Sequence, residues 1–305
     1  MSWDDLNDAH YDWPSVSEVK AYRQKIRHLV SHLIQEAPLT LPINWQNPWW
    51  AIVMGIEHER IHLETSSVLI RQHQLAYVKP HPAWTAHHQT AQAPNNDLVT
   101  IPAGQVTLGK SKDDAYYGWD NEYGQHHADV ASFQASRYLV SNQEFLAFVA
   151  DNGYQQAAYW SEEGWAWREF AQAQYPTFWR KQGHDWQLRL MTEEIPMPWD
   201  WPVEVNYHEA KAFCQWLSQQ QQQQIRLPSE DEWQRLYQHA QLDHPSASQR
   251  CQANLHLDYA ASACSVTQFQ HGELFDVVGN VWQWTETPTY PFTGFDVHPI
   301  YDDFT

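Results

Sequence analysis

Apolar residues recur every three or four positions in two stretches near the start of the chain, and this spacing predicts two helices. The first stretch follows Pro14, and Ser15 or Ser17 can cap its helix. Its apolar positions are Val19, Tyr22, Ile26, Leu29, Val30 and Leu33. The second stretch, residues 49–72, is apolar around much of its circumference. Because a helix that is apolar on most sides is usually a buried one, we expect the second helix to be largely buried in a helical bundle.

The pattern stops in residues 79–97, where three prolines stand among His, Ala, Gln and Asn with almost no periodicity. Such a segment is typical of a linker. A chain of 305 residues has room for two domains of ordinary size. We therefore place a domain boundary near residue 95, between a helical domain of residues 1–95 and a second domain of residues 96–305.

The second domain contains both short predicted strands and short predicted helices. Residues 98–104 and 105–109 are predicted to be strands joined by a glycine turn. Helical patterns appear at residues 141–149, after a capping serine, and at residues 207–218. Residues 225–228 are predicted to form a short strand, and Ser229 is predicted to cap a helix that starts with acidic residues. The six glutamines at 219–224 are interpreted as an expanded loop. The chain is therefore expected to have an α+β fold.

Composition narrows the classes of partner. The formal net charge is −19 and only 18 residues are Lys or Arg, so neither a nucleic acid nor an anionic membrane is an expected partner. Eighteen Trp and fifteen Tyr accompany only eleven Gly, which indicates an irregular fold packed with large side chains. Small zwitterionic or cationic substrates fit this charge balance.

The three cysteines, Cys214, Cys251 and Cys264, form neither a disulfide framework nor a metal-binding spacing, which fits a reducing cytoplasm. No run approaches 18 apolar residues, and the first residues do not have the pattern of a signal peptide. A cytoplasmic location is therefore expected.

The densest group of functional side chains is the string from Glu57 to Glu64. At about 100° per residue, His58 and His62 stand about 40° apart and one turn above each other, so both imidazoles can reach a single metal ion. Glu64 lies about 200° around from His62 and cannot bind the same ion from this helix. We interpret it as a carboxylate that supports the site from outside the ligand set. The alternative is a pair of core histidines satisfied by hydrogen bonds.

The same string also matches the His-Glu-x-x-His pattern of zinc peptidases, in which Glu59 would be the general base between His58 and His62. That pattern is short, and the enzyme would need a third ligand farther along the chain. No downstream string supplies one. A zinc peptidase therefore stands as an alternative function.

Two later strings carry a resemblance to a known fold. Residues 226–233 read Arg-Leu-Pro-Ser-Glu-Asp-Glu-Trp, and residues 279–285 read Gly-Asn-Val-Trp-Gln-Trp-Thr. Both resemble segments of the formylglycine-generating-enzyme (sulfatase-modifying-factor) fold, which is mixed and loop-rich and serves several chemistries. Formylglycine synthesis needs a late cysteine pair, and no cysteine follows Cys264. We do not expect that activity here.

The order of these features, a His-x-x-x-His-x-Glu helix followed by this fold, resembles the nonheme-iron sulfoxide synthases of thiohistidine biosynthesis. Residues 47–72 are most similar to the ovothiol branch, the 5-histidylcysteine sulfoxide synthases. The resemblance implies a DinB-like helical bundle that binds the metal, followed by a formylglycine-generating-enzyme-like domain. It also implies that His58 and His62 are ligands of Fe(II).

The implied reaction uses O2 to couple the sulfur of L-cysteine to the imidazole of L-histidine, forming a C–S bond and a sulfoxide. A monomer is the state we expect. The resemblance further implies an active-site tyrosine from the second domain that donates a proton or a hydrogen bond. Tyr290 and Tyr301 are the candidates, and Tyr290 is favoured; either could instead be a packed loop tyrosine.

The chain also departs from that family. The third histidine ligand of the family comes from the first bundle helix, farther upstream than this chain begins, and only His10, His28 and His32 precede the pair. His28 and His32 share a helix face, so one of them is a conceivable substitute. The segments that normally complete the second domain are also missing. We therefore expect a fragment truncated at both ends, and a catalytically inactive two-domain fragment is the remaining alternative.

Overall fold

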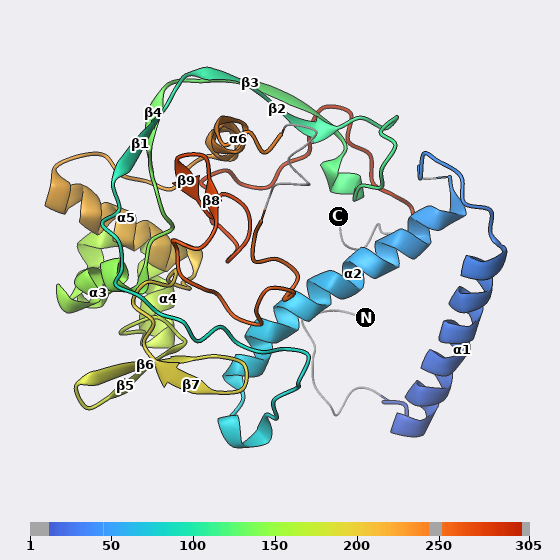
Figure 1. Cartoon of the computed structure of the whole chain (residues 1–305), viewed down its shortest axis with the longest axis horizontal. Coiled ribbons are helices and arrows are strands. Elements are labelled where there is room, and N and C mark those ends of the chain that lie inside the picture. Colours follow the sequence, from blue (N-terminus) through green and yellow to red (C-terminus); the bar gives the residue numbers. More distant parts are fainter. Residues whose placement is uncertain (1–11, 45, 244–251, 301–305) are drawn as a thin grey trace.

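The computed structural model describes residues 12–44, 46–243 and 252–300 and shows two long helices ahead of a domain of short helices and small sheets (Figure 1). The α-helices are α1 (Val16–Glu36), α2 (Pro48–Leu69), α3 (Asn142–Ala150), α4 (Glu162–Ala171), α5 (Tyr207–Gln221) and α6 (Glu230–His239). The strands are β1 (Leu98–Ile101), β2 (Gly104–Lys110), β3 (Gly124–Val130), β4 (Phe133–Ser136), β5 (Trp179–Gln182), β6 (Asp185–Arg189), β7 (Glu194–Pro196), β8 (Gln270–His271) and β9 (Leu274–Phe275). The predicted mixture of helices and strands is confirmed.

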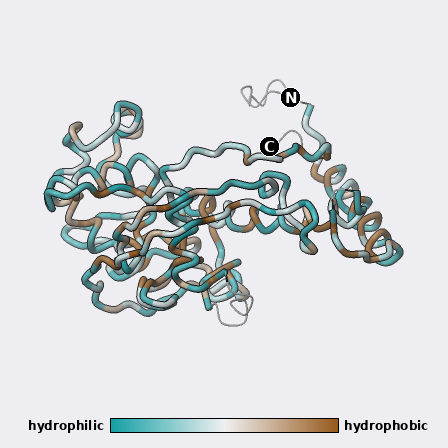
Figure 2. The backbone as a smooth tube through the Cα atoms, turned by 90° about the horizontal axis from the view of Figure 1, so that it is seen from above, coloured by the Kyte–Doolittle hydropathy of each residue, from teal (hydrophilic) through white to brown (hydrophobic). Residues whose placement is uncertain are grey.

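Helix α1 begins where the sequence predicts. The Glu18 N–H donates to Ser15 Oγ and the Ser15 N–H donates to Glu18 Oε2, so the two residues form a capping box. None of the residues of α1 is buried. Figures 1 and 2 show the helix at one end of the molecule, apart from the remainder of the described chain.

Helix α2 starts at Pro48, after Asn47 accepts a hydrogen bond from the Trp49 N–H. The prediction that this helix is largely buried is wrong, because Trp50 is its only buried residue. Apolar residues around a helix are buried only if other elements cover several sides. Before residue 95, the described chain contains only α1 and α2 as α-helices, so the predicted DinB-like bundle is not seen.

The two ends of α2 are fastened to the second domain. At the first end, the Trp50 ring stacks on the His298 imidazole with centroids 3.7 Å apart and planes 11° from parallel. Just beyond the other end, Arg71 Nε donates to the Arg189 carbonyl at 2.7 Å, and its guanidinium pairs with Glu204. Since these contacts lie 21 residues apart (71 − 50), α2 spans about 30 Å of the second domain.

Residues 78–97 contain no helix or strand and run along the second domain. The Thr85 carbonyl accepts from the Ala261 N–H at 2.9 Å, and the His87 N–H donates to Ser262 Oγ at 2.9 Å. This proline-containing segment is therefore hydrogen-bonded to the domain that follows it.

The sheets of the second domain are small and antiparallel. Strand β1 pairs with β4 and β2 pairs with β3, and together they form a long curved arm over α6 (Figure 1). The strands predicted at residues 98–109 therefore exist, but they pair with later strands and not with each other. The other sheets are β5-β6-β7 and β8-β9.

The largest core cluster lies among α3, α5 and the β5-β6-β7 sheet, and most of its members are aromatic. They include Phe145, Phe148, Tyr154, Trp160, Trp179, Trp201, Phe213 and Trp216. Large side chains thus fill the fold, as the composition indicated. No described helix combines the length and apolar character that a membrane crossing needs.

Two local predictions are wrong. The first glutamines of the tract, residues 219–221, belong to the last turn of α5, and the capping residue that follows, Gln222, has a left-handed conformation. Residues 225–228 form no strand, although Ser229 caps α6 as predicted. Helix α5 extends past its last apolar contact because glutamine is a good helix former.

Candidate active site

The two histidines of α2 lie side by side. The ring centroids of His58 and His62 are 4.5 Å apart and their planes are inclined by 73°. His58 is half-buried and His62 is exposed. At about 100° per residue, His58 and His62 point about 130° around the axis of α2 from the side that carries Trp50 and Arg71. The predicted proximity of the two imidazoles is confirmed, and their role as metal ligands stays a prediction.

A third ligand is not present in the part of the chain that the structure describes. Within that part, no three His, Cys, Asp or Glu side chains form a group that could hold a metal ion. The proposed substitutes lie on α1, where His28 contacts Gln24 and His32 contacts Glu36. His10 lies outside the described residues. Two imidazoles alone do not fit a three-ligand iron site, nor the three protein ligands of a zinc peptidase.

Glu64 connects α2 to the second domain. Its Oε2 accepts a hydrogen bond from Trp282 Nε1 at 2.9 Å, and the two residues are 218 positions apart in the sequence. Glu64 lies on the same side of α2 as Trp50 and Arg71, since the intervals of 14 and 7 residues (64 − 50 and 71 − 64) are multiples of seven. The role of Glu64 toward a metal stays a prediction.

The Gly-Asn turn of the second motif directs Trp282 to this contact. Gly279 has a φ of +86°, and a Cβ added there would lie 2.8 Å from the Asn254 carbonyl oxygen. The Asn280 side chain accepts from the Cys264 N–H at 2.9 Å and donates to the Cys264 carbonyl at 3.1 Å. The turn is therefore fixed by its backbone and by one amide side chain.

A cavity of about 1060 Å³ lies where the C-terminal half of α2 meets this turn. Its walls come from α2, from the segment before α5, and from the loops around residues 254–263 and 279–284. Arg71 and Glu209 supply two buried ionisable groups to the wall, and Arg71 Nη2 has no hydrogen-bond partner among the described residues. The cavity is large enough for small-molecule ligands.

Glu209 is a buried carboxyl group at the start of α5. Tyr154 Oη donates to its Oε1 at 2.5 Å, and the Asn206 N–H donates to its Oε2 at 2.8 Å. Burial raises the pKa of Glu209 to about 7, and these hydrogen bonds oppose the shift. Burial likewise raises the pKa of Asp276 to about 7. Both groups therefore favour the protonated form in the folded protein.

The stability of the protein should consequently fall as the pH rises. Because the folded state binds the Glu209 proton more tightly than the unfolded state does, protonation of Glu209 favours folding. This contribution to the free energy of unfolding is complete below the ordinary pKa of 4.5 and is lost as the pH rises through about 7. For Glu209 the loss is about 3 kcal/mol. Glu209→Gln keeps the cap and removes the titration, so urea unfolding at pH 5 and pH 8 should show a smaller difference than in the wild type. An unchanged difference would contradict the assignment, and Asp276→Asn serves as the parallel variant.

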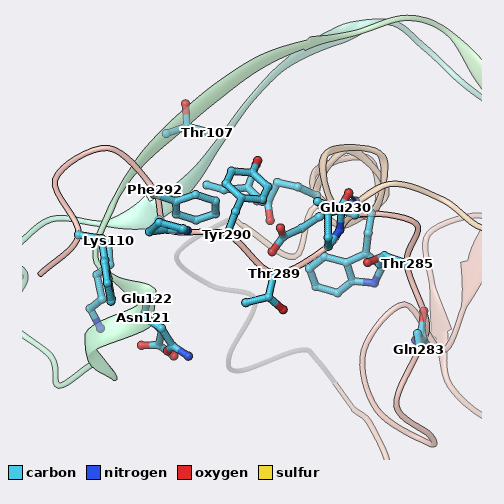
Figure 3. A pocket seen from close by; sticks show the side chains of 18 of the residues that line it. Thr107, Lys110, Asn121, Glu122, Glu230, Gln283, Thr285, Thr289, Tyr290 and Phe292 are labelled. Atoms are coloured by element: carbon cyan, nitrogen blue, oxygen red, sulfur yellow. Dashed lines mark hydrogen bonds between the residues drawn. The ribbon is translucent and has the colours of Figure 1, made fainter. Parts of the chain in front are cut away.

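Tyr290 lines a different cavity, of about 1110 Å³, beneath the β2-β3 arm. Figure 3 shows it there with Thr289 and Glu230, and its ring lies 5.9 Å from that of His126. No described residue of α2 lines this cavity. The structure thus places Tyr290 away from the cavity at α2, and its predicted role is not tested. Tyr301 lies outside the described residues.

Comparison with known proteins identifies the family to which the second domain belongs. The profile of the Sulfatase-modifying factor enzyme 1-like domain matches residues 84–294. The chain belongs to this family. The match includes both motifs that indicated the fold, and it begins in the segment that is hydrogen-bonded to the second domain.

Relatives within the sulfatase-modifying-factor family include the hercynine oxygenase of Mycolicibacterium thermoresistibile, 34% identical over 212 residues that cover 62% of this chain and 43% of that protein. Ergothioneine biosynthesis protein 1 of Schizosaccharomyces pombe is 23% identical over an alignment of 328 positions, gaps included, which covers 96% of this chain and 38% of that protein. The chain thus spans less than half the length of either. The solved structure of PvdO from Pseudomonas aeruginosa matches with a TM-score of 0.41 and 18% identity over 68% of this chain and 73% of that one.

Burial holds the two described cysteines of this sulfatase-modifying-factor domain, Cys214 and Cys264, in the thiol form at neutral pH. Burial raises the pKa of Cys264 to about 12 and that of Cys214 to about 11. Because the thiolate is the reactive form, these raised pKa values disfavour reaction of either side chain at neutral pH. Cys251 lies outside the described residues.

Proposed function

We propose that this chain is part of a nonheme Fe(II)- and O2-dependent sulfoxide synthase that joins the sulfur of cysteine to the imidazole ring of histidine, as in ovothiol biosynthesis. The observation that carries the proposal is the adjacent pair His58 and His62 on a helix fastened to a sulfatase-modifying-factor domain. The relatives named hercynine oxygenase and ergothioneine biosynthesis protein support the class of reaction.

In this proposal the cavity at α2 binds the polar ends of the amino-acid substrates. Neither His58 nor His62 lines it, so the substrates would have to extend around α2 to reach the metal. The cavity volume of about 1060 Å³ accommodates two small amino acids. Arg71 Nη2, which has no hydrogen-bond partner among the described residues, is assigned as the donor to a substrate carboxylate, and the guanidinium carbon lies 3.7 Å from the centroid of the Phe178 ring. His58 and His62 would supply two of the iron ligands, which are one fewer than the family uses. No contact in the described chain favours the zinc peptidase.

The proposal is tested by oxygen consumption. The chain is purified without oxygen, loaded with Fe(II), and mixed with oxygenated buffer that contains cysteine and histidine, with each omitted in turn. Uptake that needs both amino acids, together with a product of the mass of a histidylcysteine sulfoxide, is the expected result. Uptake with cysteine and hercynine, but not with histidine, would place the enzyme in the ergothioneine branch. An iron-loaded chain that consumes no oxygen with either pair would contradict the proposal.

A further inference from the structure

Arg71 and Glu204 each present one free hydrogen-bonding atom at the cavity beside α2. Both side chains line this cavity, and Arg71 Nη1 pairs with Glu204 Oε2. Arg71 is only 7% exposed, yet its Nη2 has no hydrogen-bond partner among the described residues. Among the same residues, Glu204 Oε1 accepts no hydrogen bond. Because a buried donor without an acceptor costs free energy, Nη2 indicates a place for a group of a ligand.

The charges around Arg71 favour an anionic group at Nη2. The Arg189 carbonyl accepts from Arg71 Nε at 2.7 Å, and Arg189 is itself a guanidinium that is 1% exposed. Burial lowers the pKa of Arg189, and the charges of Arg180 and Arg71 lower it further. Glu194 opposes this shift, and Glu204 pairs with Arg71. The three guanidinium groups outnumber these two carboxylates, so a carboxylate is the ligand group that best suits Nη2.

Glu204 supplies an acceptor directly beside this donor. In an α-amino acid the carboxylate and the ammonium group are attached to one carbon atom, so the side chains that bind them must be adjacent. Arg71 and Glu204 meet this condition because they are paired with each other. The other acidic residues of the wall do not meet it. Both oxygens of Glu209 already accept hydrogen bonds, and Glu64 stands about two turns of α2 away from Arg71.

The rest of the wall near this pair suits an aromatic or apolar side chain. The rings of Trp282 and Trp284 line the cavity and are 72% and 49% exposed. Their indole N–H groups already donate to Glu64 and to the Val205 carbonyl. These rings therefore offer a ligand their apolar faces and no hydrogen-bond donor.

We propose that Arg71 and Glu204 form a two-point site for the main chain of an α-amino acid. Arg71 Nη2 donates to the carboxylate, and Glu204 Oε1 accepts from the ammonium group. A fully methylated nitrogen has no N–H to donate and would leave Glu204 Oε1 unpaired, so the site selects amino acids with an unmethylated ammonium group. Glu204 is thus a specificity-determining residue. That the ligand is a substrate rests on the proposed function, whereas its binding needs no metal.

The site is tested by isothermal titration calorimetry of the metal-free chain with L-histidine at pH 8. Three analogues each change one charged group: histamine lacks the carboxylate, imidazolepropionate lacks the ammonium group, and N,N,N-trimethylhistidine has no N–H on its main-chain nitrogen. Each should bind at least about 10-fold more weakly than L-histidine, which is the effect of one charge-assisted hydrogen bond. No binding of L-histidine at millimolar concentration, or an analogue that binds as tightly, would overturn the site.

Glu204→Gln tests the acceptor, since it removes the charge and keeps the shape of the side chain. The preference for L-histidine over imidazolepropionate should fall from about 10-fold to nearly none. Glu286→Gln is the matched control, because Glu286 is exposed to the same degree, pairs with Lys211 and does not line the cavity. It should keep the full preference. Each preference is a ratio of two affinities of one variant, so a change in the folded fraction does not alter it.

Failure of this inference differs from failure of the proposed function. Oxygen uptake by the iron-loaded chain, with an unchanged preference in Glu204→Gln, would overturn the role of Glu204 and leave the reaction in place. Selective binding of L-histidine without any oxygen uptake would contradict the reaction and support the two-point site.

Discussion

His62→Ala is expected to reduce oxygen uptake to the level seen without protein and to weaken Fe(II) binding by more than about 100-fold. Mutating groups that only orient a metal ligand already costs 10–100-fold in affinity or activity, and the loss of a ligand itself costs more. The two imidazoles lie 4.5 Å apart, so His58 alone cannot replace the missing contact at the same ion. Oxygen-electrode traces and anaerobic dialysis measure the two effects.

The matched control for this variant is His184→Ala, which removes an exposed imidazole from the turn between β5 and β6. It should retain both iron binding and oxygen uptake. A separate variant, Glu59→Gln, distinguishes the peptidase alternative, because it should abolish peptide cleavage and leave oxygen uptake in place. If His62→Ala consumed oxygen like the wild type, the assignment of the site to α2 would be wrong.

Arg71→Met is expected to lower the free energy of unfolding by about 2–4 kcal/mol. Arg71 is only 7% exposed, and its substitution removes the bond to the Arg189 carbonyl, the pair with Glu204 and the contact with the Phe178 ring. The variant should also release the C-terminal end of α2, which amide hydrogen exchange along α2 would detect as faster exchange.

Arg60→Met is the control within the same helix. Arg60 pairs with Glu57 one turn away, but its side chain is 54% exposed, so the loss should stay within about 0.5 kcal/mol. Urea unfolding of both variants at one pH gives the comparison. Equal losses would mean that the buried contacts of Arg71 do not hold α2 to the second domain.

Local signals in the sequence were sufficient to place most helices. Ser15, Ser141 and Ser229 each cap a helix as predicted, because a capping box depends on residues only three positions apart. The environment of α2 could not be predicted in the same way. Periodicity shows which sides of a helix are apolar, but it does not show whether another element covers them.

Only the part of the candidate site that depends on local sequence could be predicted. The proximity of His58 and His62 follows from helix geometry and was predicted. The contacts of Glu64 with Trp282 and of Tyr154 with Glu209 join residues 218 and 55 positions apart, and no local pattern reveals them. An arginine at position 71, following an apolar run, was the one available signal that this end of α2 meets a polar partner.

The regular spacing of the contacts along α2 makes the length of this helix as important as its chemistry. One residue inserted between Trp50 and Arg71 would turn one end by about 100° relative to the other and lengthen the helix by about 1.5 Å. The stacking on His298 and the pair with Glu204 could then no longer form together. An insertion of seven residues would restore the angle but add about 10 Å. The number of residues in α2 is therefore set by the distance between these two contacts on the second domain.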